Sequence, residues 1–352
     1  MDIYINGKFL CQKTSGVQRY AREVTKGIDR LYGSWGNLNF KLIAPKEEFD
    51  SSFTLEHIPV IFLDGGPSYK FEQLTLPKYL KKREGYLLNL ANLAPIKLKG
   101  RNIFTLHDTA FYTHPEFFSK KFVMAYKFIT QRTLPKSKLV FTVSNFSKTE
   151  ILNHFKVKED NIYVVPNAVL PSFGKSNDPI KQEFKDLAKD NFYFFVGSWS
   201  KNKNMAYVCA LAKKNNDRKF IISGDKAKAF AELDIDIPDN VYFLGRLNDA
   251  ELAFFYSKCS AFIFPSMYEG FGIPPIEAIH CCCRCIIASN IPTLKEILED
   301  NANYIEPLDY ENLISLDNLK VMSEPEAKRI MEKYSWDKSA SIVITSISKA
   351  IS

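Results

Sequence analysis

The sequence predicts an α/β protein made of two domains, each built around a parallel β-sheet. Its 352 residues exceed what one hydrophobic core usually fills, and its 46% hydrophobic and 25% charged residues are typical of a soluble globular chain. Strand-like and helix-like segments alternate through both halves, which favours parallel sheets. A stretch rich in Pro, Gly, Ser and Asn at 171–183 separates the halves. We therefore expect one domain over 1–170 and a second over 171–335.

The first half contains the segments of one such sheet. The apolar residues of 17–32 fall on one stripe at helical spacing, and Thr14 or Ser15 can cap that helix. Ser144 or Asn145 can cap the next helix in the same way. We expect helices at 17–32 and 146–155, a loop at 11–16, and strands at 1–6, 40–45, 58–63, 102–108, 138–144 and 162–167.

The second half repeats this alternation. We expect strands at 192–197, 219–224, 241–245 and 261–265, and helices at 204–215, at 249–258 and from about Pro275. Ligands of parallel sheets bind at the carboxyl ends of the strands. With two such domains, the expected site is the cleft between them.

The charge is spread unevenly. Residues 1–170 hold 25 Lys+Arg and 15 Asp+Glu, a balance of +10, whereas the remainder holds 22 and 25, a balance of −3. Basic runs at 78–83 and 97–101 can be a solvated surface, or they can face an anionic membrane or an anionic acceptor. No nucleic-acid motif accompanies the charge. The N-terminal segment does not resemble a signal peptide, and no apolar run approaches the roughly 20 residues of a membrane helix. We expect a cytoplasmic protein, with a peripheral position at the inner face of the cell membrane as one possibility.

Seven cysteines include the group 281-CCCRC-285. Disulfides are not expected without an export signal, and a zinc site would need a second cluster of ligands that the chain does not contain. No D-x-D string that could bridge a diphosphate to a metal is present. The sequence therefore predicts no metal site, and it favours a small buried strand at 283–288.

The string 264-FPSMYEGFGIPPIEAI-279 holds two glutamates, Glu269 and Glu277, on either side of a turn with two glycines and a Pro-Pro pair. An apolar strand delivers Glu269 to the carboxyl end of the sheet. We expect Glu277 in the first turn of the following helix, where backbone N–H groups and the helix dipole favour an anion. Two carboxylates around a phosphate site suit a sugar nucleotide, because each can hold the hydroxyls of one sugar. The alternative is a surface turn followed by a glutamate that stabilises the helix start.

The full string resembles the signature of retaining glycosyltransferases of the GT-B fold, in particular glycosyltransferase family 4, which reads P-S-x-x-E-G-F-G-x-P-x-x-E-A. Segments at 143–151, 164–169, 241–266, 289–297 and 334–340 also resemble family segments, in family order. The resemblance implies two Rossmann-like domains facing each other across a cleft, with a C-terminal helix at about 336–352 that packs back on the first domain. It implies an N-terminal domain that binds the acceptor and a C-terminal domain that binds the nucleotide sugar.

The resemblance also implies roles for individual residues of the string. Glu269 would contact hydroxyls of the donor sugar, and Glu277 would contact the ribose. The backbone of Gly270, Phe271 and Gly272 would approach the sugar and the phosphates.

A second family segment is 196-VGSWSKNKN-204, where Lys203 and Asn204 match the pattern. Lys203 would bind the diphosphate. Asn202 stands where the family has Arg, and an amide does not replace a bidentate guanidinium. Lys201 can restore the charge there, but not the geometry. Taken alone, this segment is a polar turn before a helix.

Two segments of the first half also contain candidate site residues. His107 and Asp108 resemble the family's H-D pair, whose histidine contacts the donor near the reacting carbon and stabilises charge there. Asp108 can orient this histidine or cap the next turn. Gly16 resembles the first glycine-bearing loop, near donor phosphates or acceptor, and Arg19 can contact an anion or be solvated.

Together these features predict transfer of a sugar from a GDP-, UDP- or dTDP-sugar to an acceptor hydroxyl, with retention and without a cofactor or a metal. His107 and Glu269 are the expected catalytic residues. The expected acceptor is a lipid-linked glycan or an oligosaccharide of a cell-surface polysaccharide such as O-antigen or capsule. Two alternatives stay open, namely a sugar-nucleotide isomerase of the same fold and a catalytically silent partner subunit.

Overall fold

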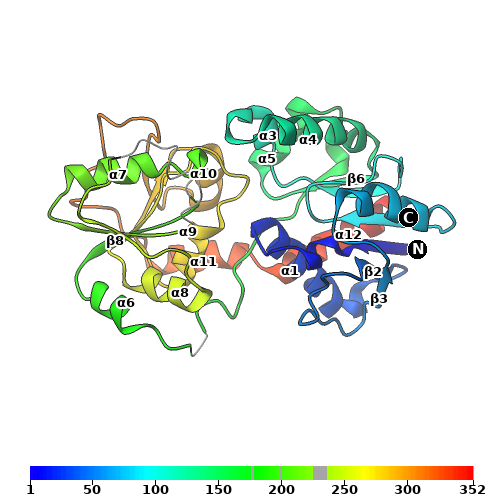
Figure 1. Cartoon of the computed structure of the whole chain (residues 1–352), viewed down its shortest axis with the longest axis horizontal. Coiled ribbons are helices and arrows are strands. Elements are labelled where there is room, and N and C mark those ends of the chain that lie inside the picture. Colours follow the sequence, from blue (N-terminus) through cyan, green and yellow to red (C-terminus); the bar gives the residue numbers. More distant parts are fainter. Residues whose placement is uncertain (176–177, 199, 225–235, 352) are drawn as a thin grey trace. The chain divides into compact units, whose positions relative to one another are not determined.

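The computed structural model describes residues 1–175, 178–198, 200–224 and 236–351. The chain divides into two compact units, one formed by Met1–Asn167 with Ser335–Ser352 and the other by Ala168–Tyr334. Each unit holds one entirely parallel sheet with helices on it (Figure 1). The two-domain α/β architecture expected from the sequence is confirmed.

The first unit is built on a seven-stranded sheet in the order β3-β2-β1-β4-β5-β6-β7. Consecutive strands run outward from β1 to β3 on one side, and from β4 to β7 on the other, so the order reverses between β1 and β4. The strands are β1 (Asp2–Asn6), β2 (Asn39–Pro45), β3 (Val60–Leu63), β4 (Tyr86–Asn89), β5 (Asn102–Thr105), β6 (Leu139–Thr142) and β7 (Ile162–Val164).

The second unit repeats this plan with a six-stranded sheet in the order β10-β9-β8-β11-β12-β13. Here the order reverses between β8 and β11, which pair in register from Ala261 opposite Tyr193. The strands are β8 (Phe192–Val196), β9 (Lys219–Ser223), β10 (Val241–Phe243), β11 (Ala261–Phe264), β12 (Ile286–Ser289) and β13 (Asn303–Ile305).

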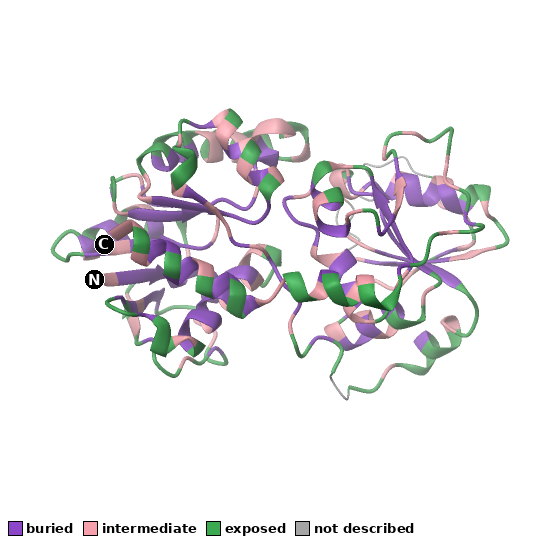
Figure 2. Ribbon diagram, turned by 180° about the vertical axis from the view of Figure 1, so that it is seen from behind, coloured by how far each residue is buried: buried purple, intermediate pink, exposed green. Residues whose placement is uncertain are grey.

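Helices cover the sheets and fill the cores, and most strand residues are buried in both units (Figure 2). Parallel strands with helices on them are apolar toward both faces, which explains runs such as 192-FYFFV-196. The helices are α1 (Gly16–Arg30), α2 (Leu76–Leu80), α3 (Ala110–Thr113), α4 (Lys120–Thr133), α5 (Asn145–His154), α6 (Gln182–Leu187), α7 (Met205–Lys214), α8 (Asp249–Lys258), α9 (Ile273–His280), α10 (Pro292–Leu298), α11 (Glu324–Lys333) and α12 (Trp336–Ile351).

The C-terminal helix α12 belongs to the first unit and packs against α1. A Cβ added to Gly27 of α1 would lie 2.8 Å from the Ala340 side chain, so the glycine permits the close approach of the two helices. The Ser339 hydroxyl donates to the carbonyl of Pro166 at 2.7 Å. These contacts explain why the last helix returns to the unit that contains the N-terminus.

The main strands and helices expected from the sequence are present, with shifts at their ends. Ser15 and Ser144 are the observed helix caps, and the Ser144 side chain accepts from the N–H of Ser147 at 3.0 Å. The linker expected at 171–183 overlaps the start of α6 at Gln182, and its residues 176–177 lie outside the described residues. The strand expected at 283–288 begins only at Ile286. Within the described residues, no helix is long and apolar enough to cross a membrane.

Candidate functional site

The residues predicted to bind the donor lie in the second sheet, at the point where its strand order reverses. The loops after the adjacent strands β8 and β11 hold 197–204 and 265–272. In open parallel sheets, ligands bind outside the carboxyl ends of the strands at such a point. The sheet topology therefore brings two sequence motifs, about 65 residues apart, to one place.

Lys203 and Glu269 form the centre of this site. The Lys203 ammonium lies 2.5 Å from Oε1 of Glu269, and it also lies 5.3 Å from the centre of the Phe264 ring. Their side chains are 21% and 13% exposed, so both are accessible from solvent. The Thr293 hydroxyl donates to the Glu269 carbonyl at 2.7 Å and fixes the backbone of the loop. The structure thus joins the expected phosphate ligand and the expected sugar ligand in one ion pair.

Gly272 is the residue before α9, and its conformation favours glycine. Its φ is +98°, and a Cβ at this position would lie 2.8 Å from Cδ2 of Leu294 in α10. Phe271 is buried, with its ring edge against Tyr334 at 5.2 Å between ring centres. Phe271 can therefore offer a ligand its backbone but not its ring. Gly270 lies between Glu269 and the buried Phe271.

The expected position of Glu277 in the first helical turn is wrong. The helix α9 begins at Ile273, and both Pro274 and Pro275 lie within its first turn, where N–H groups have no intrahelical partner. Glu277 is therefore the fifth helical residue, and it is buried. The Tyr256 hydroxyl lies 3.4 Å from its Oε2, and burial together with this carboxylate raises the pKa of Tyr256 well above its usual value.

Contacts of Asn202 and Asn204 hold the loop after β8. The Asn202 backbone carbonyl accepts from the N–H of Met267 at 2.8 Å, which ties this loop to the one after β11. Asn204 adopts a left-handed conformation, and its side chain bonds the carbonyl of Pro307 at 2.6 Å and the hydroxyl of Tyr310 at 3.0 Å. Asn204 therefore holds the loop in shape. Lys201 is exposed beside it.

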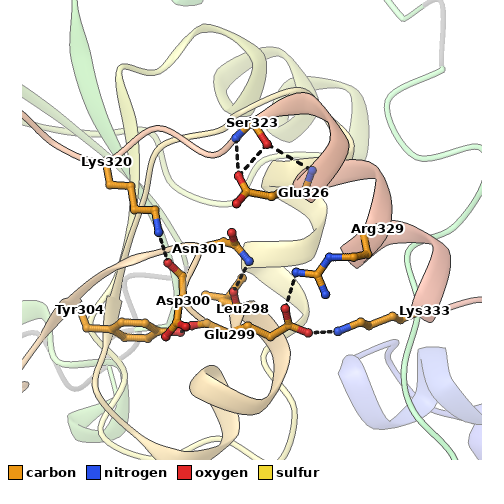
Figure 3. Close-up of polar contacts among 10 residues, drawn as sticks. All are labelled: Leu298, Glu299, Asp300, Asn301, Tyr304, Lys320, Ser323, Glu326, Arg329 and Lys333. Carbon is orange, nitrogen blue, oxygen red and sulfur yellow. Dashed lines mark hydrogen bonds and ion pairs between the residues drawn. The ribbon is translucent and has the colours of Figure 1, made fainter.

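The helix α10 contacts the loop that carries Glu269 through Thr293 and Leu294, and its C-terminal end is held by α11. Glu299, the residue after α10, forms ion pairs with Arg329 and Lys333 of α11 (Figure 3). These two cations lower the pKa of the Glu299 carboxyl to about 2. The Tyr304 hydroxyl donates to the Glu299 carbonyl in the same cluster. The α10–α11 contact thus keeps Thr293 and Leu294 against the loop that carries Glu269.

The first sheet has its own cavity at the point where its order reverses. The segment after β1 and the segment after β4 line a cavity of about 480 Å³. Inside it, the buried Lys8 ammonium lies 2.6 Å from Oε2 of buried Glu72, and Nδ2 of Asn6 donates to Oε1 of the same carboxylate at 3.2 Å. Ser15 and Gln18, which flank Gly16, also line the cavity.

His107 lies next to this cavity, on the loop two residues beyond β5 rather than on the strand as expected. Its Nε2 lies 3.0 Å from the carbonyl of Leu90, so Nε2 carries the proton, and its ring meets that of Tyr20 with 4.6 Å between centres. Its backbone N–H donates to Oδ1 of Asn92 at 2.9 Å. Burial lowers the pKa of His107 to about 4, so the imidazole is neutral at pH 7.

The remaining predicted residues of the first unit have structural partners. Oδ1 of Asp108 accepts from the N–H of Ala110 at 2.9 Å, as a residue that caps the next turn would. Gly16 is the first residue of α1, and a Cβ added at this position would meet no atom within 4 Å. The backbone N–H of Arg19 donates to the carbonyl of Ser15 at 2.8 Å in the first turn of α1.

Lys8, Glu72 and Asn92 were not predicted from the sequence. A signal existed for Asn6 and Lys8, because polar residues directly after a buried strand in a parallel sheet are site candidates. Glu72 lies in a short π-helical segment (Phe71–Thr75) that no pattern predicts. Its pairing with Lys8, 64 positions away, is a property of the fold alone.

Two family models match the chain, one to each half. Glycosyltransferase Family 4 matches residues 14–173, and Glycosyl transferases group 1 matches residues 176–335.

Among curated proteins, the chain is similar to the O-antigen chain mannosyltransferase RfbU of Salmonella typhimurium, with 32% identity over 61% of this chain and 59% of that protein. It is also similar to the N-acetylgalactosamine-N,N'-diacetylbacillosaminyl-diphospho-undecaprenol 4-alpha-N-acetylgalactosaminyltransferase of Campylobacter jejuni, with 26% identity over 58% and 55%. In both cases the match spans less than two thirds of the relative.

Among solved structures, the sucrose-phosphate synthase of Thermosynechococcus elongatus matches 100% of this chain and 99% of its own, with a TM-score of 0.71 at 16% identity. That likeness concerns the fold. The two family models and this fold together place the chain among the GT-B glycosyltransferases of the family 4 and group 1 type.

Proposed function

We propose that the protein transfers a sugar from a nucleotide-diphosphate sugar to a hydroxyl of a lipid-linked or oligosaccharide acceptor in surface-polysaccharide assembly. The observation that carries this proposal is the Lys203–Glu269 pair where the order of the second sheet reverses, within the segment that matches the group 1 family model. The names of the two relatives support an O-antigen or an undecaprenol-linked acceptor.

In this proposal the bound donor separates Lys203 from Glu269, and each side chain then contacts a different part of the donor. The Lys203 ammonium turns to the diphosphate, since a lysine is a good point charge for phosphate, and Glu269 then accepts hydrogen bonds from the hydroxyls of the sugar. Exposed Lys201 adds charge near the leaving group. Glu277, whose carboxylate lies in α9 next to Tyr256, accepts from the ribose.

The neutral imidazole of His107 suits an oxocarbenium-like transition state. A protonated ring would repel the developing positive charge, whereas a neutral ring presents the lone pair of Nδ1. Retention would follow if the departing diphosphate accepts the proton of the acceptor hydroxyl on the same face of the sugar. We propose this same-face route, with Lys203 and Lys201 rather than a metal ion holding the leaving group.

Thermal unfolding with UDP, GDP, dTDP and ADP tests the donor site. A nucleotide at about 100 times its dissociation constant should stabilise the fold by about 2.7 kcal/mol. We expect one nucleotide to raise the midpoint of the wild type, and Glu277→Ala to lose that shift. If no nucleotide or nucleotide sugar stabilises the wild type, the proposal fails and the silent-subunit alternative, suggested by Asn202, takes its place. An isomerase would instead convert the bound nucleotide sugar without any acceptor.

We also propose that the first unit binds an anionic membrane surface through one face of α4. Met124 is 71% and Phe128 is 51% exposed, and they lie between Lys120 and Arg132 at intervals of four residues. A helix face that presents apolar side chains between cations suits the interface of an anionic bilayer. The +10 balance of residues 1–170 supports the same surface.

Co-sedimentation with vesicles of phosphatidylglycerol or phosphatidylcholine at low salt tests this. We expect binding to the anionic vesicles alone, and its loss in Met124→Ser/Phe128→Ser. The matched control is Leu308→Ser/Val321→Ser, which removes apolar side chains that are 68% and 64% exposed in the second unit. Equal loss in both double variants, or no binding by the wild type, would contradict the proposal.

A further inference from the structure

We propose that the cavity lined by the segments after β1 and β4 binds a neutral sugar ring of the acceptor, with the Lys8–Glu72 pair holding its hydroxyls and Tyr69 packing on its face. The inference rests on the proposed transfer reaction and names the part of the acceptor that the first unit recognises. It assigns a role to Lys8, Glu72 and Tyr69, which the sequence motifs left unused.

The size and position of the cavity suit a ligand. A volume of about 480 Å³ lies within the roughly 300–1,000 Å³ of typical small-molecule pockets. The cavity opens where the strand order of a parallel sheet reverses, which is where such sheets bind their ligands. All of its lining residues belong to the first unit.

The polar groups of the lining match a polyol rather than an anion. Lys8 and Glu72 are the lining residues that carry full charges, and at 2.6 Å they neutralise each other. A phosphate or a uronate would need a cation without such a partner. The other polar side-chain groups are amides and hydroxyls, which both donate and accept as sugar hydroxyls do. They belong to Asn6, Gln12, Ser15, Gln18, Ser68, Tyr69, Asn92 and Tyr126.

The charged pair is fixed in place before any ligand arrives. Oε2 of Glu72 accepts from Lys8, Oε1 accepts from Asn6, and Nδ2 of Asn6 also lies 3.2 Å from Oδ1 of Asn89. Burial raises the pKa of Glu72 above its ordinary value, while Lys8 and Asn6 oppose that rise. A pre-oriented pair can accept and donate hydrogen bonds to adjacent hydroxyls without reorganising, which favours specific binding.

Aromatic side chains provide the apolar side of the cavity. Tyr69 is 54% exposed although it lines the cavity, and the Lys8 ammonium lies 4.9 Å from the centre of its ring. The half-buried ring of Tyr126 lines the cavity as well. Tyrosine offers a flat apolar body with a polar tip, which suits the C–H face and the hydroxyl edge of a sugar ring.

The cavity is also connected to His107. Asn92, which lines it in a left-handed conformation, accepts the backbone N–H of His107, and the neighbouring Leu90 carbonyl accepts from its ring. A non-glycine residue with φ of +59° is held there by its surroundings. A sugar in the cavity therefore lies against the loop that positions His107.

The test separates acceptor recognition from donor chemistry. Saturation-transfer NMR with methyl mannoside, glucoside, galactoside and N-acetylglucosaminide measures sugar binding without any donor. Steady-state transfer to the octyl glycoside of the sugar that binds then gives kcat and the KM for acceptor. The variants are Tyr69→Ala and the charge-removing double variant Lys8→Met/Glu72→Gln. The matched control is Tyr32→Ala, because Tyr32 is also 54% exposed in the first unit but does not line the cavity.

We expect one glycoside to show saturation transfer to the wild type and to Tyr32→Ala. Loss of the aromatic contact in Tyr69→Ala should raise the KM for acceptor about tenfold with little change in kcat. The thermal shift by nucleotide should stay at its wild-type value in every variant. The inference is overturned if no glycoside binds while nucleotide does, or if both variants keep the wild-type KM. Absence of nucleotide binding in the wild type would instead indicate that the proposed reaction itself is wrong.

Discussion

Both sheets place a lysine–glutamate pair where their strand order reverses, yet the two pairs differ in their surroundings. Lys8 and Glu72 lie 2.6 Å apart, and their side chains are 11% and 3% exposed, with both oxygens of the carboxylate bonded. Lys203 and Glu269 lie 2.5 Å apart, and their side chains are 21% and 13% exposed. Among the residues that the structure describes, Lys203 is the side-chain partner of Glu269. The first pair is a fixed part of a cavity wall, whereas the second can open to a ligand.

Breaking the fixed pair should have the largest effect on stability. Lys8→Met leaves the Glu72 carboxylate buried without its cation, which should lower the free energy of unfolding by about 3–5 kcal/mol. Urea unfolding at pH 7 measures this. The double variant Lys8→Met/Glu72→Gln should recover much of the loss, because no uncompensated charge remains. If the single variant unfolds at the wild-type urea concentration, the pair is not the rigid element described above.

Because His107 is buried in its neutral state, the free energy of unfolding should fall by about 3 kcal/mol as the pH is lowered. Its pKa is about 4 in the folded chain and about 6.5 when unfolded, so the unfolded chain binds a proton first as the pH falls. The stability of the buried neutral ring is therefore complete above about pH 6.5 and is lost progressively down to about pH 4. His107→Asn should flatten that part of the curve.

Exposed His57, which stacks on Tyr32, provides the control for the pH profile. His57→Asn should keep the wild-type slope between pH 6.5 and 4. A wild-type profile that does not change in this window would show that His107 binds its proton at the same pH in the folded and the unfolded chain.

Breaking the second pair should affect activity far more than stability. Glu269→Gln should change the free energy of unfolding by less than about 1 kcal/mol, since both side chains reach solvent. Loss of a group that binds the reacting sugar should lower kcat about 100-fold. Unfolding and transfer assays on the same preparation compare the two effects. A large stability loss with unchanged kcat would make this pair structural, like the first.

The smallest effect is expected from the ion pairs that connect α10 to α11. Glu299→Gln weakens the ion pairs with Arg329 and Lys333, and these partly exposed pairs should contribute about 0.5–1 kcal/mol. The pKa of Glu299 is about 2, below its usual value, so the contribution is present above about pH 4.5 and is lost as the pH falls toward 2. Thermal midpoints at pH 7 and pH 3 should therefore differ more in the wild type than in this variant.

The same comparison indicates what the sequence could predict. The apolar runs and the E-G-F-G string predicted the second sheet and the loops that carry Lys203 and Glu269, because both depend on local patterns. Their pairing did not follow from any pattern, and neither did the depth of Glu277, since two prolines fit into the first turn of α9 instead of one. Strand β4 (Tyr86–Asn89) is too short to show alternation. The Lys8–Glu72 pair depends on a π-helical turn, which only the packing of the first unit stabilises.

The most direct test of the donor site compares two lysines that differ mainly in their place in the second sheet. Lys203 is 21% exposed and pairs with Glu269, while Lys219 is 19% exposed and pairs with Asp190 at 3.0 Å, at the opposite, amino end of β9. Calorimetry gives the dissociation constant of the nucleoside diphosphate identified by thermal unfolding. We predict that Lys203→Met weakens it about 10- to 100-fold and that Lys219→Met leaves it unchanged. Equal affinities for all three proteins would contradict a diphosphate site in the loops after β8 and β11.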